Sequence, residues 1–282
     1  MSKIIKIKRG LDIKLKGEAE KKIGKALQSN IFAVKPPDFI GVTPKLSVKK
    51  GVEVKAGDAL FFDKARPDII IPSPVSGEVT EIKRGAKRKI LDIIVLADKT
   101  TNYRDFGAAN PSTLSEDEVR SKLLESGCWS LIRQRPFSII ANPNETPKGI
   151  FISCFNTHPL APDYNFIVKD NEAIFQKGID ALAKLSDNVN LDINGENGKS
   201  SAFENINGVK INRFTGPHPA GNIGVQVHKL NPLNKGEVIW YLNPQDVLII
   251  GRLFETGKYD ASKIIALTGS EIKDPQYFRV LS

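Results

Sequence analysis

Trp129, Arg133, Arg135, Pro136 and Phe137 form the segment of this 282-residue chain that is best suited to binding a ligand. Aromatic faces stack on planar molecules, and guanidinium groups donate hydrogen bonds to carbonyl oxygens. The combination therefore fits a planar, carbonyl-bearing ligand. It fits single-stranded nucleic acid equally well. A third interpretation is a clamp between two domains, in which the arginines cap helix carbonyls.

A second segment combines glycines with prolines and a histidine. It reads Thr215-Gly-Pro-His-Pro-Ala-Gly-Asn, so that Gly216, His218 and Gly221 define a candidate ligand-facing loop. Backbone N–H groups in such a loop can face an anion or a flat ligand, and the alternative is a rigid turn between strands. The sequence contains no GxGxxG loop, which would place the phosphates of a dinucleotide on a helix N-terminus.

Histidine and cysteine are the residue types that most often bind metals, and here they are few. The spacing of His158, His218 and His228 matches no zinc motif, and Cys128 and Cys154 are too few for a cysteine-ligated iron–sulfur cluster. We therefore expect no metal site. No GxSxG, HExxH or P-loop pattern occurs either, so we expect no catalytic residue. Two cysteines also provide no disulfide framework, which favours a reduced, cytoplasmic environment.

The elements that must position these segments alternate between strand and helix over residues 112–270. Ser115-Glu-Asp-Glu is a capping box, which predicts a helix that stops at Gly127. Apolar residues at helical spacing predict further helices over 171–185 and 245–254. Strands are expected at 149–155, 189–193, 208–214 and 263–267. This alternation predicts a Rossmann-like α/β domain with an open, mostly parallel sheet, and we expect residues 271–282 to begin a further domain.

Residues 1–105 are expected to form an all-β domain. Two segments, 46–61 and 72–85, show the same order of predicted elements, which is a strand, a turn at a glycine and a second strand. The pattern VKxGxxVKxGxxLF followed by SPVSGxVxxI resembles the biotinyl/lipoyl-like barrel-sandwich hybrid. In carrier members of that family a lysine at a hairpin tip is modified. Lys64 lies in the corresponding segment, but no methionine flanks it, which favours an unmodified relative.

The positive charge of the chain is confined to its first third. Residues 1–99 hold 22 Lys and Arg against 12 Asp and Glu, whereas residues 100–282 hold 19 against 20. The basic part could bind RNA through phosphate contacts, but aromatic residues among its lysines are scarce, so we expect no nucleic-acid partner. A docking surface that includes Lys83, Arg84, Lys87 and Arg88 is the interpretation that we prefer.

Several segments together resemble the A-subunit family of the sodium-translocating NADH:quinone reductases. They occur in the family's order along the whole chain and include Ile5-Lys-Ile-Lys-Arg-Gly-Leu-Asp-Ile, Asp38-Phe-Ile-Gly-Val-Thr-Pro, Arg133-Gln-Arg-Pro-Phe-Ser, Asn156-Thr-His-Pro-Leu-Ala and Gly216-Pro-His-Pro-Ala-Gly. The C-subunit of the Rnf electron-transport complex and the flavin-binding subunit of respiratory complex I are more distant relatives. Family members are longer, so the chain is expected to be an N-terminal fragment.

The resemblance implies a peripheral subunit on the cytoplasmic face of the bacterial inner membrane. It would belong to a six-subunit translocase that oxidises NADH, reduces ubisemiquinone or ubiquinone to ubiquinol and exports Na+. It implies no covalently bound cofactor here, with FMN, FAD and iron–sulfur centres on partner subunits. The neighbouring partner would be a membrane-embedded, flavin-bearing subunit, and contact with the membrane would come through partners only.

Ubiquinone is the candidate ligand that the resemblance suggests. We expect its head group at the junction of the two domains, because clefts commonly form there. The expected contacts are Trp129, Arg133, Arg135, Pro136 and Phe137 in the α/β domain and Lys35, Pro36, Pro37, Asp38, Phe39 and Ile40 in the β domain. Two alternatives remain open: a purely structural docking subunit, and a flavin- or NADH-binding electron-transfer subunit of the Rnf type.

Overall fold

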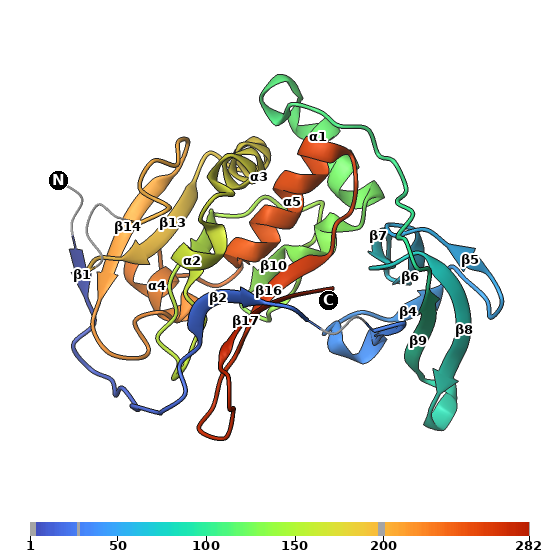
Figure 1. Ribbon diagram of the computed structural model, residues 1–282. Coiled ribbons are helices and arrows are strands. Elements are labelled where there is room, and N and C mark those ends of the chain that lie inside the picture. Colours follow the sequence, from blue (N-terminus) through green and yellow to red (C-terminus); the bar gives the residue numbers. More distant parts are fainter. Residues whose placement is uncertain (1–3, 27–28, 197–200, 282) are drawn as a thin grey trace.

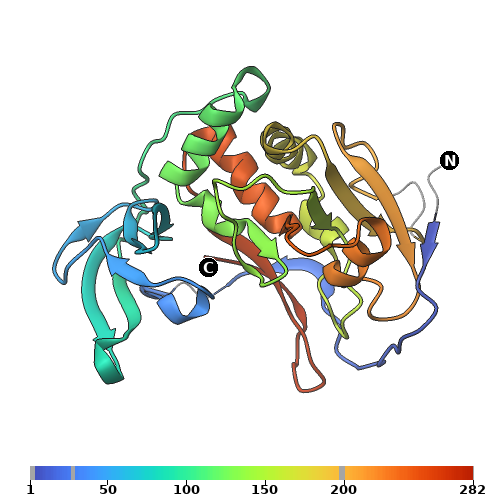
Figure 2. The same cartoon turned by 180° about the vertical axis from the view of Figure 1, so that it is seen from behind.

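The computed structural model describes residues 4–26, 29–196 and 201–281. An all-β part and a larger α/β part lie side by side, joined by an extended linker between residues 98 and 110 (Figure 1; Figure 2 gives the opposite view). The linker is tied to the α/β part, because Phe106 N donates to Gly257 O at 2.7 Å and Ala109 N donates to Phe254 O at 2.9 Å.

Two sheets form the all-β part, in the orders β3-β9-β8-β5 and β4-β6-β7. Gly77 is the first residue of β8, and only glycine fits at this position. Its φ is 145°, and the Cβ of any other residue would lie 2.0 Å from Leu96 O. The expected barrel-sandwich hybrid is confirmed. Its elements are β3 (Ile31–Val34), η1 (Pro36–Asp38), β4 (Pro44–Leu46), β5 (Glu53–Val54), β6 (Ala59–Asp63), β7 (Arg66–Pro72), β8 (Gly77–Arg84), η2 (Ala86–Arg88) and β9 (Ile90–Ala97).

A mixed sheet forms the centre of the α/β part, and its strand order within the described residues is β1-β14-β13-β12-β15-β10-β11. The first five strands of this order are parallel, whereas β10 runs antiparallel to β15 and β11 antiparallel to β10. The expected open, mostly parallel sheet is confirmed. The strands are β1 (Ile4–Lys6), β10 (Arg133–Arg135), β11 (Ile139–Ile140), β12 (Ile150–Ser153), β13 (Val189–Asn194), β14 (Lys210–Thr215) and β15 (Ile239–Leu242).

Helices cover both faces of this sheet. Buried residues of α3 and α5 share one core with Ile150 and Ile152 of β12, whereas Val227 of α4 packs on Phe151 on the other face. None of the described helices is long and apolar enough to cross a bilayer. The helices are η3 (Pro111–Thr113), α1 (Glu116–Glu125), η4 (Cys128–Leu131), α2 (Tyr164–Val168), α3 (Glu172–Leu185), α4 (Ile223–Leu230) and α5 (Pro244–Thr256).

The structure confirms the helix ends that were expected from local sequence signals. Ser115 and Glu118 form the expected capping box of α1, and α5 ends at Gly257 with φ 71°. Asn243 caps the start of α5 by accepting from two backbone N–H groups, those of Gln245 and Asp246. Because these signals depend on neighbours within a few residues, the sequence alone is enough to locate them.

We expected residues 1–105 as a whole to form the all-β domain, but in the structure its first two strands pair elsewhere. β1 pairs with β14, and β2 (Glu20–Gly24) pairs with β17 (Gln276–Leu281), so this part of the chain belongs with the α/β part and not with the β domain. β16 (Ser262–Leu267) also leaves the main sheet and forms a hairpin with β17. The alternation of apolar and polar residues in a short strand indicates which of its faces is buried, but not which other strand it will pair with. This explains the difference between the expected and the observed arrangement.

A continuous apolar core joins the two parts. Leu60, Phe61 and Ile69 of the β part belong to the same buried cluster as Trp129 and Ile140 of the α/β part. Arg66 adds a polar link: its Nε donates to the buried Asp63 Oδ2 at 2.9 Å, and its Nη1 donates to Ile140 O at 2.9 Å. The two parts are therefore held in one arrangement by packing and by a guanidinium bridge.

Gly127 provides a test of this junction. Its φ is 75°, and a Cβ would lie 2.5 Å from Pro72 Cδ on β7. Gly127→Ala should therefore lower the free energy of unfolding through backbone strain of about 1–2 kcal/mol and through overpacking of about 1–3 kcal/mol. Urea unfolding monitored by tryptophan fluorescence measures the change.

Gly51→Ala is the matched control for this substitution. Gly51 has a similar φ of 85°, but no atom lies within 4 Å of the position of its Cβ. It should show the strain alone. Equal losses for the two variants would mean that contact with Pro72 does not constrain the junction.

Candidate functional site

A cleft of about 530 Å³ lies between the β part and the α/β part. Its floor is formed where β12 and β15 end, and the first residues of α4 and α5 border it. The β part closes the opposite side. The lining residues are Val34, Phe39, Ile71, Pro72, Pro74, Ser130, Leu131, Arg133, Ser153, Phe155, Asn156, His158, Tyr164, Gly221, Asn222, Ile223, Tyr241, Leu242, Asn243, Asp246, Tyr259 and Lys263.

The position of the cleft follows from the strand order. From β12 the chain passes through α3 to β13 on one side, and from β14 it returns through α4 to β15 on the other side of β12. β12 and β15 therefore flank a topological switch point. In open α/β sheets, ligands bind outside the carboxyl ends of the strands at such a point. The fold thus supplies a binding crevice although the sequence lacks a phosphate-binding loop.

The wall contributed by the β part is apolar. It consists of Val34 and Phe39 from either side of η1 and of Ile71, Pro72 and Pro74 from the end of β7. The Phe39 ring packs edge-on against the buried Phe61 ring, with the ring centroids 5.7 Å apart. This contact fixes the orientation of Phe39, so the cleft has a rigid aromatic surface on this side.

The opposite wall carries polar and charged groups. Arg133 reaches the cleft from β10, His158 from the loop after β12, and Lys263 from β16. Lys263 Nζ lies 3.0 Å from Asp246 Oδ1, at the start of α5. Burial raises the pKa of Tyr164 to about 12, so this phenol remains a hydrogen-bond donor at neutral pH. The wall therefore presents several donors to an acceptor-rich ligand.

Tyr241 adds a second aromatic group to the cleft. Its hydroxyl forms a hydrogen bond with Ser138 Oγ, and the guanidinium of Arg135 lies over its ring, 5.1 Å from the centroid. A cation above the ring is attracted electrostatically to the aromatic face, which restricts the orientation of the ring. Arg135 thus lies behind the lining and orients Tyr241.

The glycine–proline loop reaches the cleft only at its end. Gly221 lines it, whereas Gly216 and His218 do not. His218 Nδ1 lies 2.9 Å from Thr157 Oγ1, and the His218 ring lies 4.6 Å from the ring of His158, which does line the cleft. A Cβ on Gly10 would lie 1.9 Å from His218 O, so close packing on residues 7–12 also shapes the loop.

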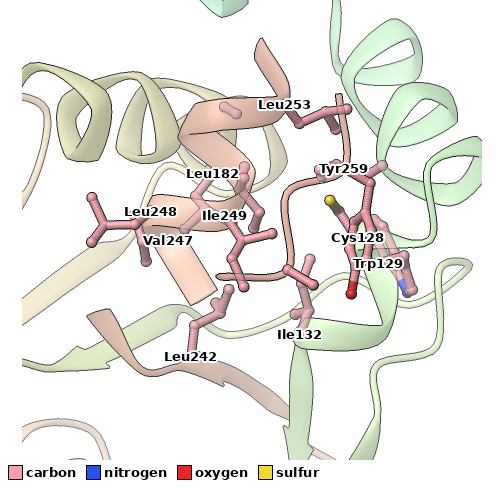
Figure 3. Close-up of a cluster of buried hydrophobic side chains, with 14 of the residues drawn as sticks. Cys128, Trp129, Ile132, Leu182, Leu242, Val247, Leu248, Ile249, Leu253 and Tyr259 are labelled. Carbon is pink, nitrogen blue, oxygen red and sulfur yellow. The ribbon is translucent and has the colours of Figure 1, made fainter. Parts of the chain in front are cut away.

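Other residues expected at the site lie elsewhere. Trp129 is buried in the core beside Cys128 and Tyr259 (Figure 3). Its Nε1 donates to Ala141 O at 2.9 Å. Phe137 is 76% exposed on the β10–β11 turn. Of the remaining expected residues, none is among those that line the cleft: Lys35, Pro37, Asp38 and Ile40 are exposed, Pro36 is buried, and Pro136 follows β10.

Several lining residues carry no signal in the sequence. Tyr241, Lys263 and Tyr164 lie in ordinary strand or helix segments that meet only in the folded chain. Asp246 is the exception, because Asn243-Pro-Gln-Asp reads as a helix start and a helix start borders the crevice of an α/β sheet.

A buried carboxyl lies on the α4 side of the sheet. Asp192 on β13 is fully buried; its Oδ1 accepts from Asn212 Nδ2 at 2.9 Å, and its Oδ2 has no hydrogen-bond partner. Ser153, which lines the cleft, is its register partner on β12. Burial without full compensation raises the pKa of Asp192 to about 7.

The cysteines offer no reactive site. Cys128 and Cys154 are both buried, and burial raises the pKa of each thiol, that of Cys128 to about 12. Reactive cysteines have a lowered pKa and partial exposure. Among the residues that the structure describes, no three His, Cys, Asp or Glu side chains come together as metal ligands.

Comparisons with known proteins match both parts of the chain. A family model described as the NqrA second alpha/beta domain matches residues 114–259, and one described as the NqrA N-terminal barrel-sandwich hybrid domain matches residues 5–98. The chain is similar to the A-subunit of the Na(+)-translocating NADH-quinone reductase of Pseudomonas aeruginosa, at 36% identity over 98% of the chain. The corresponding subunits of Alcanivorax borkumensis and Haemophilus influenzae are 34% and 31% identical over 98% and 99% of the chain. The chain spans 62–63% of the length of these relatives.

Asp192 gives a pH-dependent prediction. The folded protein protonates this carboxyl near pH 7, whereas the unfolded chain does so near pH 4. The folded state therefore binds more protons between these values, and its stability falls as the pH rises through this window. Because an amide does not titrate, Asp192→Asn should gain stability relative to the parent by up to about 1.4 kcal/mol per pH unit there.

Urea unfolding of both proteins at about pH 5 and about pH 7.5 measures this difference. Taking the difference between variant and parent cancels the other titrating groups. If the difference is the same at both pH values, Asp192 is not protonated in the folded protein.

Proposed function

Because the chain belongs to the A-subunit family of the Na+-translocating NADH-quinone reductases, we propose that it binds the head group of ubiquinone in the cleft between its two parts. The observation that carries this proposal is the pairing of an apolar, aromatic wall with a wall of hydrogen-bond donors at a topological switch point. The sequence points to the same junction through segments 35–40 and 133–137.

The walls of the cleft match the two properties of a quinone head group. Its ring is planar and apolar, which suits Phe39 on one side and Tyr241 on the other. Its two carbonyl oxygens are acceptors, which suits Arg133, His158 and Lys263. Small-molecule sites are typically built in this way, from apolar walls with a few placed polar groups.

The same donors would assist reduction. When a quinone becomes a quinol it takes up two electrons and two protons, so each carbonyl oxygen gains negative charge and then a proton from solvent. Positively charged donors such as Arg133 and Lys263 stabilise that charge most strongly in a site from which water is excluded. The ion pair with Asp246 holds the Lys263 ammonium group in position. In this proposal the electrons come from FMN, FAD and iron–sulfur centres on partner subunits.

The place of the chain in the cell is part of this proposal. It is a peripheral subunit on the cytoplasmic face of the membrane, next to a membrane-embedded, flavin-bearing subunit, and takes part in ubiquinone reduction coupled to Na+ export. The family membership supports this assignment. The absence of GxGxxG from the sequence supports quinone over a dinucleotide as the ligand of the cleft.

Phe39 and Phe137 separate this proposal from the simpler sequence prediction. Both belong to the segments expected at the site, but only Phe39 lines the cleft. In calorimetric titrations of the full-length subunit with a soluble quinone, Phe39→Ala should raise Kd about tenfold, because it removes an aromatic wall. Arg133→Ala should raise Kd by a similar factor through loss of a charged donor.

Phe137→Ala is the control and should leave Kd unchanged, since this side chain is exposed outside the cleft. A larger effect of Phe137→Ala than of Phe39→Ala would place the quinone on the β10–β11 turn instead. Unchanged Kd values for all three variants would favour a docking role without quinone contact. Copurifying flavin would favour the Rnf-type alternative.

A further inference from the structure

Nine exposed cations gather in two segments that are far apart in the sequence. Residues 8–16, which link β1 to β2, hold Lys8, Arg9, Lys14 and Lys16, and the tip of the β8–β9 hairpin holds Lys83, Arg84, Lys87, Arg88 and Lys89. We call these segments the strap and the basic tip. Neither belongs to the cleft.

The strap also exposes apolar side chains. It is extended, and Leu11, Ile13 and Leu15 are 72%, 58% and 56% exposed. The one acidic residue of the strap, Asp12, is also exposed, and its Oδ1 accepts a hydrogen bond from His218 N at 2.9 Å. Three neighbouring aliphatic side chains in water are unfavourable, and with cations on both sides of them they suit a partner that is both apolar and anionic.

The basic tip contains no acidic residue between positions 83 and 89. Asp92 faces Lys83 across the hairpin, and the other cations lie beyond this pair. The Arg84 guanidinium donates to Arg88 O at 3.1 Å, which ties the two sides of the turn together. Like charges so close to one another repel, so an anionic partner relieves the repulsion.

Both segments lie on the same side of the molecule. In Figures 1 and 2, which differ by half a turn about the vertical axis, the blue strap and the turquoise end of the β8–β9 hairpin both point downward, below opposite parts of the molecule. The hairpin of β16 and β17 lies between them and points the same way. Two basic segments separated by the width of the protein face an extended surface rather than a pocket.

We propose that this side of the protein docks directly on the surface of a bilayer that contains anionic lipids. The basic tip and the strap lysines contact the headgroups, and Leu11, Ile13 and Leu15 enter the boundary between headgroups and acyl chains. Combined apolar and cationic contacts are the usual means by which proteins lie on membranes without spanning them. The protein then reaches the membrane through its own surface as well as through partner subunits.

Vesicle flotation with the full-length subunit tests the proposal. The parent should bind vesicles of mixed phosphatidylglycerol and phosphatidylcholine, should bind phosphatidylcholine vesicles much less, and should be released by added salt. Lys87→Ala, Arg88→Ala and Lys89→Ala combined should weaken binding at least about tenfold, given the contribution of each cation near an anionic surface. Leu11→Ser, Ile13→Ser and Leu15→Ser combined should weaken binding even in low salt.

A control with the same loss of charge uses Lys49, Lys50 and Lys55, all exposed, each replaced by Ala. β5 pairs with the first residues of β8, so these lysines lie about 20 Å from the basic tip, which is at the far end of β8. The control should bind vesicles like the parent. Equal losses in the two triple variants would show a nonspecific effect of net charge and overturn the proposal. Failure of the parent to bind anionic vesicles while it binds polyglutamate would also overturn it and would identify an acidic protein as the partner.

Discussion

A buried carboxylate at the junction of the two parts is the interaction on which the rest of the structure depends. Asp63 is fully buried, and a charge in that position is tolerated only with a partner. Arg66 is that partner, and its Nη1 donates to Ile140 O on β11. The requirement to neutralise Asp63 therefore also fixes the β part against the edge of the main sheet. Apolar packing around Phe61 and Trp129 completes the junction.

The cleft exists because two independent features meet at this junction. The crossover of the chain between β12 and β15 leaves a crevice at the carboxyl ends of the strands, as it does in any doubly wound sheet. Alone, that crevice would be open to water. The β part places Phe39, Ile71 and Pro72 over it and supplies an apolar wall. Apolar groups on one side lower the local dielectric constant, which strengthens the hydrogen bonds and charges on the opposite wall.

Both segments expected at the site reach the cleft, but local geometry decides which of their residues line it. In β10, side chains alternate, so Arg133 lines the cleft, Arg135 lies over Tyr241, and Gln134 between them points away and accepts from Trp240 Nε1 at 3.2 Å. In the segment around η1, Phe39 turns inward while its neighbours on both sides are exposed. Aromatic character does not distinguish Trp129, which fills the core, from Phe39, which lines the cleft.

Most helices and strands and the two-part architecture could be predicted from the sequence, because helix caps, glycine turns and apolar periodicity act between residues close in the chain. The family was indicated separately, by the resemblance of segments such as Arg133-Gln-Arg-Pro-Phe-Ser and Gly216-Pro-His-Pro-Ala-Gly. The pairing partners of β1, β2 and β16 are visible only in the folded structure, since the sequence of a strand does not specify which other strand it will pair with. The tertiary structure also decided that Tyr241, Lys263 and Phe39 line one cleft and that Asp192 is buried. Such properties depend on the burial of side chains between segments that are distant in the sequence, and short sequence patterns do not show which distant segments will pack together.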